Sequence, residues 1–118
     1  MLTHVHGPSL TPLALAYGWS CTTLPGDHVE LAALAKGVAA AFKAPYGTVY
    51  KTGPICSTIY KVTGDSVDYS YTVNKIKYSM TTELRDTGAY GFLLPPIQIL
   101  PSGIEAFAGV KYLMENLK

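Results

Sequence analysis

The feature that most constrains this chain is the run 83–88, Glu-Leu-Arg-Asp-Thr-Gly, which follows an alternating apolar segment. In that segment Ile76, Tyr78 and Met80 alternate with polar residues, which predicts a strand over residues 75–82. Charged groups at the end of a buried strand are costly unless they are paired or used chemically. Because only 14% of the residues are charged, two carboxylates and a guanidinium in one place indicate a structural pair or a functional site.

Length and composition narrow the class of protein. A chain of 118 residues, 48% of them hydrophobic, has room for one domain with a real core. A net charge of +1 gives no electrostatic case for binding nucleic acid or an acidic membrane, so neither partner is expected. No segment has the length of a transmembrane helix, and the first residues lack the basic and apolar regions of a signal peptide.

Two amphipathic helices are predicted. The first covers residues 28–43, after a Pro25-Gly26 turn and a capping-box pair, Asp27 and Glu30. Its apolar residues recur at helical spacing: Leu31, Leu34, Ala35, Val38 and Phe42. The second covers residues 103–117, with a capping box at Ser102 and Glu105. Its predicted inner stripe consists of Ile104, Phe107, Ala108, Met114 and Leu117.

The rest of the chain is less regular. Residues 48–51 alternate as a short strand, and residues 52–74 are predicted to be mostly loop, with a helical turn near 68–71. Residues 1–19 develop no sustained periodicity, and the apolar run 13–16 suits either a strand or a helix. Helices that alternate with strands predict an α/β fold.

Several motifs resemble one family. Residues 83–95 resemble the C-terminal signature of the zinc metallocarboxypeptidases of the pancreatic A/B type, and residues 53–60 resemble the loop that carries their substrate-closing tyrosine. The resemblance runs almost continuously over residues 17–118 and covers roughly the C-terminal third of the family's catalytic domain. It implies an α/β fold with a partial mixed, twisted sheet and flanking helices. The chain 1–118 would be the C-terminal part of one catalytic domain, with a divergent segment at residues 1–16.

The resemblance implies roles for individual residues. Glu83 matches the general base beside the metal, although a strand-end carboxylate paired with Arg85 is the alternative from the residues alone. Arg85 and Asp86 are expected to form a structural pair that orients this motif. Tyr60 matches the tyrosine that closes over the substrate and excludes water.

The resemblance also implies a specificity pocket. The residues that match its lining are Ile55, Ile59, Val67, Thr81 and Phe92. The B-type enzymes have an aspartate where Val67 stands, so an apolar residue there implies the A-type preference for aromatic or aliphatic C-terminal residues. A lysine side chain would leave its ammonium group unpaired in such a pocket.

Zinc is the implied cofactor. The family's third zinc ligand is a histidine upstream of Tyr17, which suggests His6, with His4 as the rival candidate. The family pattern His-Ser-Tyr-Ser-Gln is replaced at residues 6–10 by His-Gly-Pro-Ser-Leu. The first two zinc ligands and the oxyanion arginine belong to the missing N-terminal part of the family's domain. Catalytic zinc needs about three protein ligands, so the chain alone is predicted to be inactive on its expected substrates, peptide C-termini.

The two cysteines, Cys21 and Cys56, lack the spacing of a zinc cluster and would by themselves suit free buried thiols. Some A-type relatives carry a disulfide at matching places, so the resemblance implies a Cys21–Cys56 bridge and secretion into an oxidising compartment.

Two other functions remain as alternatives. The chain could be a truncated, non-catalytic homologue that acts only as a binding module. Residues 86–88, Asp-Thr-Gly, match the triplet of aspartic proteases. That reading is remote, because Leu84-Arg85 precedes the aspartate where two apolar residues are needed, and because two helices contradict an all-β fold.

Overall fold

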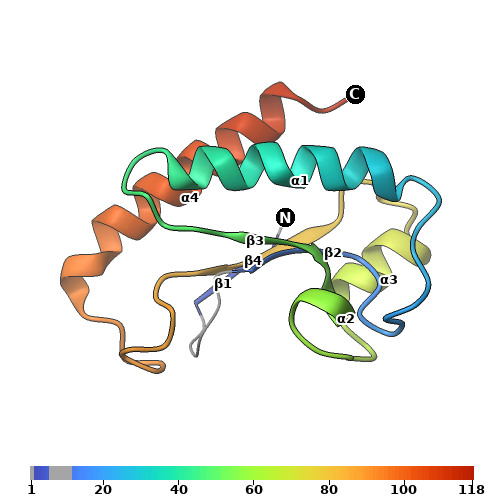
Figure 1. Cartoon of the computed structure of the whole chain (residues 1–118), viewed down its shortest axis with the longest axis horizontal. Coiled ribbons are helices and arrows are strands. Elements are labelled where there is room, and N and C mark those ends of the chain that lie inside the picture. The colour runs from blue at the N-terminus through green and yellow to red at the C-terminus, as the bar shows by residue number, and fades with distance from the viewer. Residues whose placement is uncertain (1, 6–11) are drawn as a thin grey trace.

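The computed structural model describes residues 2–5, by their backbone alone, and residues 12–118. Its centre is a four-stranded mixed sheet, in the order β1-β4-β2-β3 (Figure 1). The strands are β1 (Leu2–Val5), β2 (Pro12–Leu15), β3 (Lys51–Pro54) and β4 (Met80–Leu84). β1 is parallel to β4, β4 is antiparallel to β2, and β2 is parallel to β3. The predicted α/β class with a small mixed sheet and flanking helices is therefore confirmed.

The two long helices cover one face of this sheet. α1 (His28–Lys43) runs along the sheet, and α4 (Ile99–Glu115) crosses behind α1 in Figure 1. Leu13 and Leu15 point from β2 toward these helices, and Met80 joins them from β4. The main core forms between these strand residues and the inner sides of both helices, and Phe42 is its largest fully buried side chain.

The opposite face carries a second, smaller apolar cluster. Two short helices, α2 (Ile55–Thr58) and α3 (Ser66–Thr72), lie near the ends of β2 and β3 (Figure 1). Ile55 and Val67 from these helices pack on Ala14 and Ala16. Because successive strand residues point to opposite faces, β2 is buried on both sides and reads as a continuous apolar run. This explains why residues 13–15 of the ambiguous segment 13–16 belong to a strand.

The first predicted helix is confirmed at both ends, since α1 covers residues 28–43. Its predicted capping box is wrong, because the Asp27 side chain makes no cap bond and instead accepts a hydrogen bond from the Tyr71 hydroxyl. The strand predicted at 48–51 begins only at Lys51, and the predicted loop 52–74 contains most of β3 as well as α2 and α3.

The strand predicted over 75–82 is too long at its start, since β4 begins at Met80. Two observations explain the difference. Lys75 has a positive φ of 57°, and the Ile76 N–H bonds the carbonyl of Ser70, so the chain is still turning out of α3. The Ser79 hydroxyl then donates to the carbonyl of Ile76, which closes a further turn.

The last helix starts earlier than predicted and faces the other way. It begins at Ile99 after a 3-10 turn, η1 (Pro96–Gln98), so Ser102 lies inside the helix and caps nothing. Its buried residues are Ser102, Glu105, Gly109 and Leu113. The predicted inner stripe is wrong for this chain, because Phe107 and Met114 are 72% and 66% exposed. Among the residues that the structure describes, no helix is both long and apolar enough to cross a membrane.

Candidate functional site

Glu83 lies at the end of β4, on the face of the sheet that α1 and α4 leave open. Met80 and Leu84 of the same strand pack into the main core, so alternation turns Thr81 and Glu83 to the opposite face. Glu83 is partly exposed. Within the described part of the chain its carboxylate has neither a hydrogen-bond partner nor a salt-bridge partner, so it is not the strand-end partner of Arg85.

Arg85 pairs with Glu105 and not with Asp86, which corrects the predicted structural pair. Arg85 Nε and Nη2 donate to the two carboxylate oxygens of Glu105 at 2.8 and 2.6 Å, and Nη1 donates to Gln98 at 2.8 Å. Asp86 instead accepts a bond from the Tyr90 backbone N–H at 3.3 Å. The reason is that β4 ends at Leu84. The Arg85 side chain therefore does not follow the alternation of the strand and reaches Glu105 on α4.

Glu105 is fully buried, and sequence reasoning missed its role. Besides Arg85 it accepts a hydrogen bond of 2.5 Å from the Thr48 hydroxyl, so the carboxylate joins α4, the end of β4 and the segment before β3. The hydrogen bonds from Glu105 hold the pKa of Arg85 above its usual value. The sequence feature that could have indicated the burial of Glu105 is its spacing of four and eight residues from Gly109 and Leu113, which lie on the buried side of α4.

Most of the predicted pocket residues lie on the same face as Glu83. Ile55 and Val67 are buried in the second cluster, and Ile59 packs against it. Thr81 is in register with Ala14, which belongs to that cluster. Tyr60 is exposed and follows Ile59, the C-cap residue of α2. Phe92 lies apart in the chain, exposed in the segment between β4 and η1.

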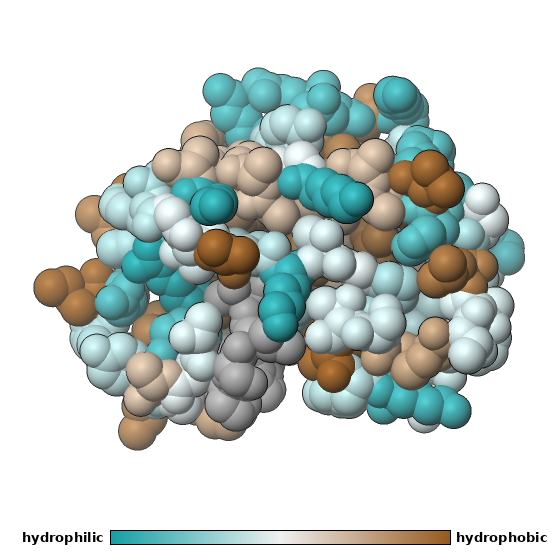
Figure 2. Space-filling view, viewed as in Figure 1, coloured by the Kyte–Doolittle hydropathy of each residue, from teal (hydrophilic) through white to brown (hydrophobic). Residues whose placement is uncertain are grey.

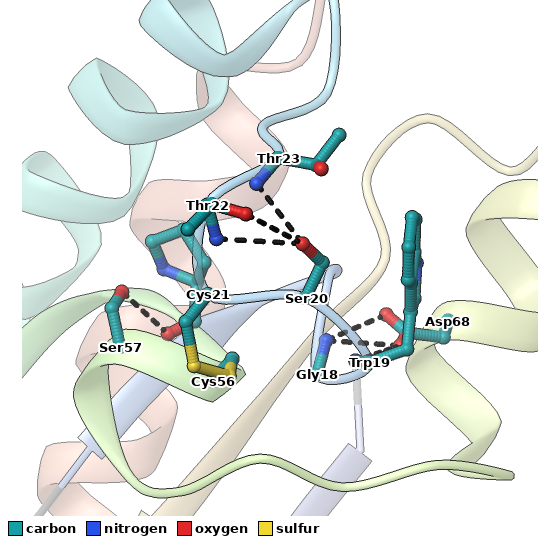
Figure 3. The surroundings of a disulfide bond; sticks show 10 residues. Gly18, Trp19, Ser20, Cys21, Thr22, Thr23, Cys56, Ser57 and Asp68 are labelled. Atoms are coloured by element: carbon teal, nitrogen blue, oxygen red, sulfur yellow. Dashed lines mark hydrogen bonds between the residues drawn. A yellow bond between two sulfur atoms is a disulfide. The ribbon is translucent and has the colours of Figure 1, made fainter.

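A buried aspartate holds the loop beside this face. The Asp68 carboxylate accepts the backbone N–H groups of Gly18, at 2.9 Å, and of Trp19, at 3.1 Å (Figure 3). It also accepts the backbone N–H of Tyr17. Asp65 caps α3 by accepting the N–H groups of Val67 and Asp68, and burial raises its pKa. A carboxylate that accepts several backbone bonds fixes a loop without any repeating structure. The sequence predicts only a helical turn around Asp68.

A disulfide ties the same loop to α2. It joins Cys21 and Cys56, whose Cα atoms are 5.0 Å apart, across a sequence separation of 35 residues (Figure 3). This is the pairing that the family resemblance implies. Gly18 fits the loop closely, since a Cβ there would lie 2.6 Å from a methyl carbon of Val62. Loop 17–23 is thus held from two sides, by α2 and by α3.

Two histidines, His4 and His6, are the candidate zinc ligands. His6 lies outside the described residues. His4 is on β1, in register with Glu83 on the neighbouring parallel strand. The described residues contain no group of three histidine, cysteine, aspartate or glutamate side chains that could hold a metal ion. The part of the site described here therefore does not fit a complete zinc centre.

The chain belongs to the zinc carboxypeptidase family, which matches residues 2–109. It is 54% identical over 99 residues to metallocarboxypeptidase A of Trichophyton rubrum, a match that covers 84% of this chain and 24% of that protein. It is 49% identical over 106 residues to carboxypeptidase A2 of Rattus norvegicus, covering 90% of this chain and 25% of the relative. The chain thus spans about a quarter of the length of these curated relatives.

Solved structures share the fold. The bovine thrombin-activatable fibrinolysis inhibitor, solved in complex with tick carboxypeptidase inhibitor, superposes with a TM-score of 0.84 at 32% identity. That match covers 98% of this chain and 40% of the bovine chain. Carboxypeptidase A from Helicoverpa armigera superposes with a TM-score of 0.78 at 24% identity, which shows likeness of fold alone. An aspartic protease reading of residues 86–88 is not favoured by these matches.

Proposed function

We propose that this chain supplies the substrate side of the active site of a zinc-dependent metallocarboxypeptidase that removes a C-terminal aromatic or aliphatic residue from peptides. The observation that carries the proposal is Glu83. It is a carboxylate without a partner in the described part of the chain, at a strand end, on the same sheet face as an apolar cluster. An unpaired carboxylate in that position is available to take a proton from attacking water and deliver it to the leaving amine.

The preference for apolar C-terminal residues rests on the second cluster. Val67 is buried beside Ile55, and Ile59 and Val62 pack around them. The nearby Asp68 carboxylate is engaged by three backbone N–H groups, so it is not free to neutralise a bound ammonium group. A lysine side chain would be desolvated there without a countercharge, whereas a phenylalanine or leucine side chain would gain by burial.

Tyr60 supplies the closing step in this proposal. It is exposed just after α2, and Cys56 of that helix is tied through the disulfide to loop 17–23. Because the disulfide fixes the backbone of α2, the Tyr60 side chain can change its rotamer without moving the helix. Closure over a bound C-terminus would exclude water from the reacting carbonyl.

The metal ligands complete the proposal. His6 is the leading candidate for the histidine ligand and His4 is the rival, whose backbone is in register with Glu83 on the neighbouring parallel strand. One histidine cannot hold catalytic zinc, which needs about three protein ligands. We therefore assign the remaining ligands and the oxyanion donor to polypeptide upstream of the matched region, and the chain 1–118 by itself is inactive.

Secretion is part of the same proposal. Disulfides persist in oxidising compartments and are rare in the cytosol. The Cys21–Cys56 bridge holds the loop beside the pocket. An enzyme that acts on extracellular peptides would keep this bridge under working conditions.

The test combines the chain with the part of the fungal relative that lies outside the match. Co-expressed complexes would be assayed for release of the last residue from peptides ending in phenylalanine or lysine. We expect phenylalanine to be released and lysine not, and Glu83→Gln to lower the rate by about 10²-fold or more. The control is Glu115→Gln, which removes an exposed carboxylate paired with Lys111 and leaves the rate unchanged. Full activity in the Glu83→Gln complex would contradict the proposal.

A further inference from the structure

A cavity of about 460 Å³ lies between α3 and the loop that carries Trp19. Its lining includes two aromatic residues, Trp19 and Tyr69, and two aspartates, Asp65 and Asp68. Val67 points from α3 into the second cluster, and Asp65 and Tyr69 each stand two residues away from it, which is about 200° around a helix. The cavity therefore lies on the other side of α3 from Val67, on which the proposed preference for apolar residues rests.

The two aromatic residues of this cavity remain open to solvent. Trp19 is 44% exposed and Tyr69 is 58% exposed. Figure 3 shows the Trp19 ring standing beside Asp68 and the ribbon of α3. The Tyr17 ring supports the Trp19 ring from the loop, with ring centroids 5.5 Å apart. The face of an aromatic ring attracts a cation, most strongly in the case of tryptophan, so both rings offer a surface for positive charge.

The carboxylates beside these rings have no cationic partner in the part of the chain that the structure describes. There, no lysine, arginine or histidine lines the cavity, and none forms a salt bridge with Asp65 or Asp68. Both carboxylates bond backbone N–H groups instead, and Asp65 Oδ2 is buried without any hydrogen-bond partner. The cavity thus combines aromatic faces with negative charge that no described side chain compensates.

The hydrogen bonds that these carboxylates already make decide which kind of cation fits. Both oxygens of Asp68 and Oδ1 of Asp65 accept backbone N–H groups, and Asp65 Oδ2 is enclosed by the protein. An ammonium or guanidinium group carries several N–H donors, and donors left unmatched in a cavity are costly. A quaternary ammonium group donates no hydrogen bond, so it needs only negative potential and aromatic faces.

A purely apolar ligand is the competing occupant, and the lining favours it less. Ser66 and Thr72 add hydroxyl groups to the wall, next to the two aspartates. On the face shown in Figure 2, the end of the molecule around α3 carries scattered hydrophobic side chains between polar ones, and not one continuous apolar surface. Small-molecule sites span roughly 300–1,000 Å³, so the volume suits a ligand of the size of choline.

We infer that Trp19, Tyr69, Asp65 and Asp68 form a binding site for a small quaternary ammonium ligand of the choline type. The two rings contact the methyl groups of the cation, and the two carboxylates supply the negative potential beside them. The inference goes beyond the proposed function and does not rest on it, because the site uses neither Glu83 nor a metal and takes no peptide.

The test uses the full chain and the fluorescence of Trp19, which is its only tryptophan and therefore reports on this cavity alone. The chain would be titrated with choline chloride at constant ionic strength. Two further titrations would use dimethylbutanol, the uncharged carbon isostere of choline, and methylammonium chloride, a cation that donates hydrogen bonds. Ligand-detected nuclear magnetic resonance of the choline methyl groups would provide a second readout.

The variants separate the aromatic faces from the charge. Tyr69→Leu removes a ring from an exposed helix position and keeps a good helix former. Tyr69→Phe keeps the ring and removes only its hydroxyl. Asp65→Asn removes the charge but keeps a side-chain oxygen that can cap α3. The matched control is Tyr90→Leu, at a 49% exposed tyrosine outside the cavity.

We expect choline to bind with a dissociation constant in the millimolar range and more tightly than either comparison ligand. Tyr69→Leu should weaken binding about 5-fold or more, and Asp65→Asn about 3-fold or more. Tyr69→Phe and Tyr90→Leu should bind choline nearly as the unaltered chain does.

Three results would overturn the inference. One is the absence of choline binding by both readouts. Another is equal binding of dimethylbutanol or methylammonium, which would make the cavity an apolar groove or an ordinary ammonium site. The third is an equal loss in Tyr69→Leu and Tyr90→Leu. None of these results bears on peptide cleavage, so the proposed function stands or falls separately.

Discussion

The two long helices of this molecule lie on the same face of one sheet, yet they bury their apolar residues to opposite extents. α1 buries the whole stripe predicted for it, from Leu31 to Phe42. α4 buries a side built around Glu105 and leaves Phe107 and Met114 in contact with solvent. Both helices have a clear apolar periodicity, so periodicity alone does not explain the difference.

The difference teaches that amphipathicity identifies the side of a helix that must be covered, but not what covers it. For α1 the cover lies within the chain, in Leu13 and Leu15 of β2. For α4 the side toward α1 is selected by shape and charge: Gly109 admits the Phe42 ring, and Glu105 meets Arg85. Within the described part of the chain its apolar side, with Leu100, Phe107 and Met114, stays exposed.

The largest effect is expected from removing the inward anchor of α4. Glu105→Ala should lower the free energy of unfolding by about 3–5 kcal/mol, because it leaves the Arg85 guanidinium without its countercharge at a partly buried position. Urea denaturation followed by circular dichroism would measure this loss. Glu115→Ala, which removes an exposed partner of Lys111, should change the free energy by less than about 0.5 kcal/mol. Equal effects at the two positions would show that Glu105 is no anchor.

The contrast between the helices can be tested with one substitution at two places. Leu31→Ala removes a fully buried side chain from α1 and should cost about 2–5 kcal/mol of unfolding free energy. Leu100→Ala removes a side chain that is 71% exposed on α4 and should stay within about 0.5 kcal/mol in the isolated chain. Thermal and urea unfolding of both variants would measure this. A comparable loss at Leu100 would mean that this apolar side of α4 is buried in solution.

Alanine substitutions at two glycines of α4, one facing α1 and one facing open space, test how closely the two helices pack. Gly109→Ala should destabilise the chain by about 1–3 kcal/mol, since its Cβ would overlap the Phe42 ring at 1.9 Å and force the helices apart. Gly103→Ala meets nothing within 4 Å, so it should stabilise the helix by up to about 1 kcal/mol through helix propensity. Opposite signs in the melting temperature are the expected result, and a gain at both positions would contradict the close packing.

The smallest effect is a dependence on alkaline pH. Burial, followed by the hydrogen bond to the Asp27 carboxylate, raises the pKa of Tyr71 above its ordinary value of 10.0. A group whose pKa is raised by folding contributes stability that is complete below its unfolded pKa and is lost as pH rises through the folded value. Stability should therefore fall above pH 10, and less steeply in Tyr71→Phe. Unfolding curves at pH 8 and pH 11 would test this, and an unchanged slope would count against it.

Much of the candidate site follows from local sequence. The position of Glu83 at the end of a strand follows from the alternation that precedes it, although the strand itself begins later than the alternation predicts. The apolar character of Ile55 and Val67 is likewise visible in the sequence, and the structure brings both into one cluster. The partner of Arg85 could not be predicted, because Glu105 is 20 residues further along the chain and becomes a neighbour only when α4 packs on the sheet.

The sequence by itself determined the bounds of α1, the α/β class and the family, because each depends on spacings or motifs carried by residues close together in the chain. Only the tertiary structure decided which side of α4 is buried, which acid pairs with Arg85, and that the Asp68 carboxylate holds a loop some 50 residues before it. Hydrogen bonds and close packing act over a few ångströms, so pairs distant in sequence are chosen by the arrangement of the whole fold and not by the residues beside them.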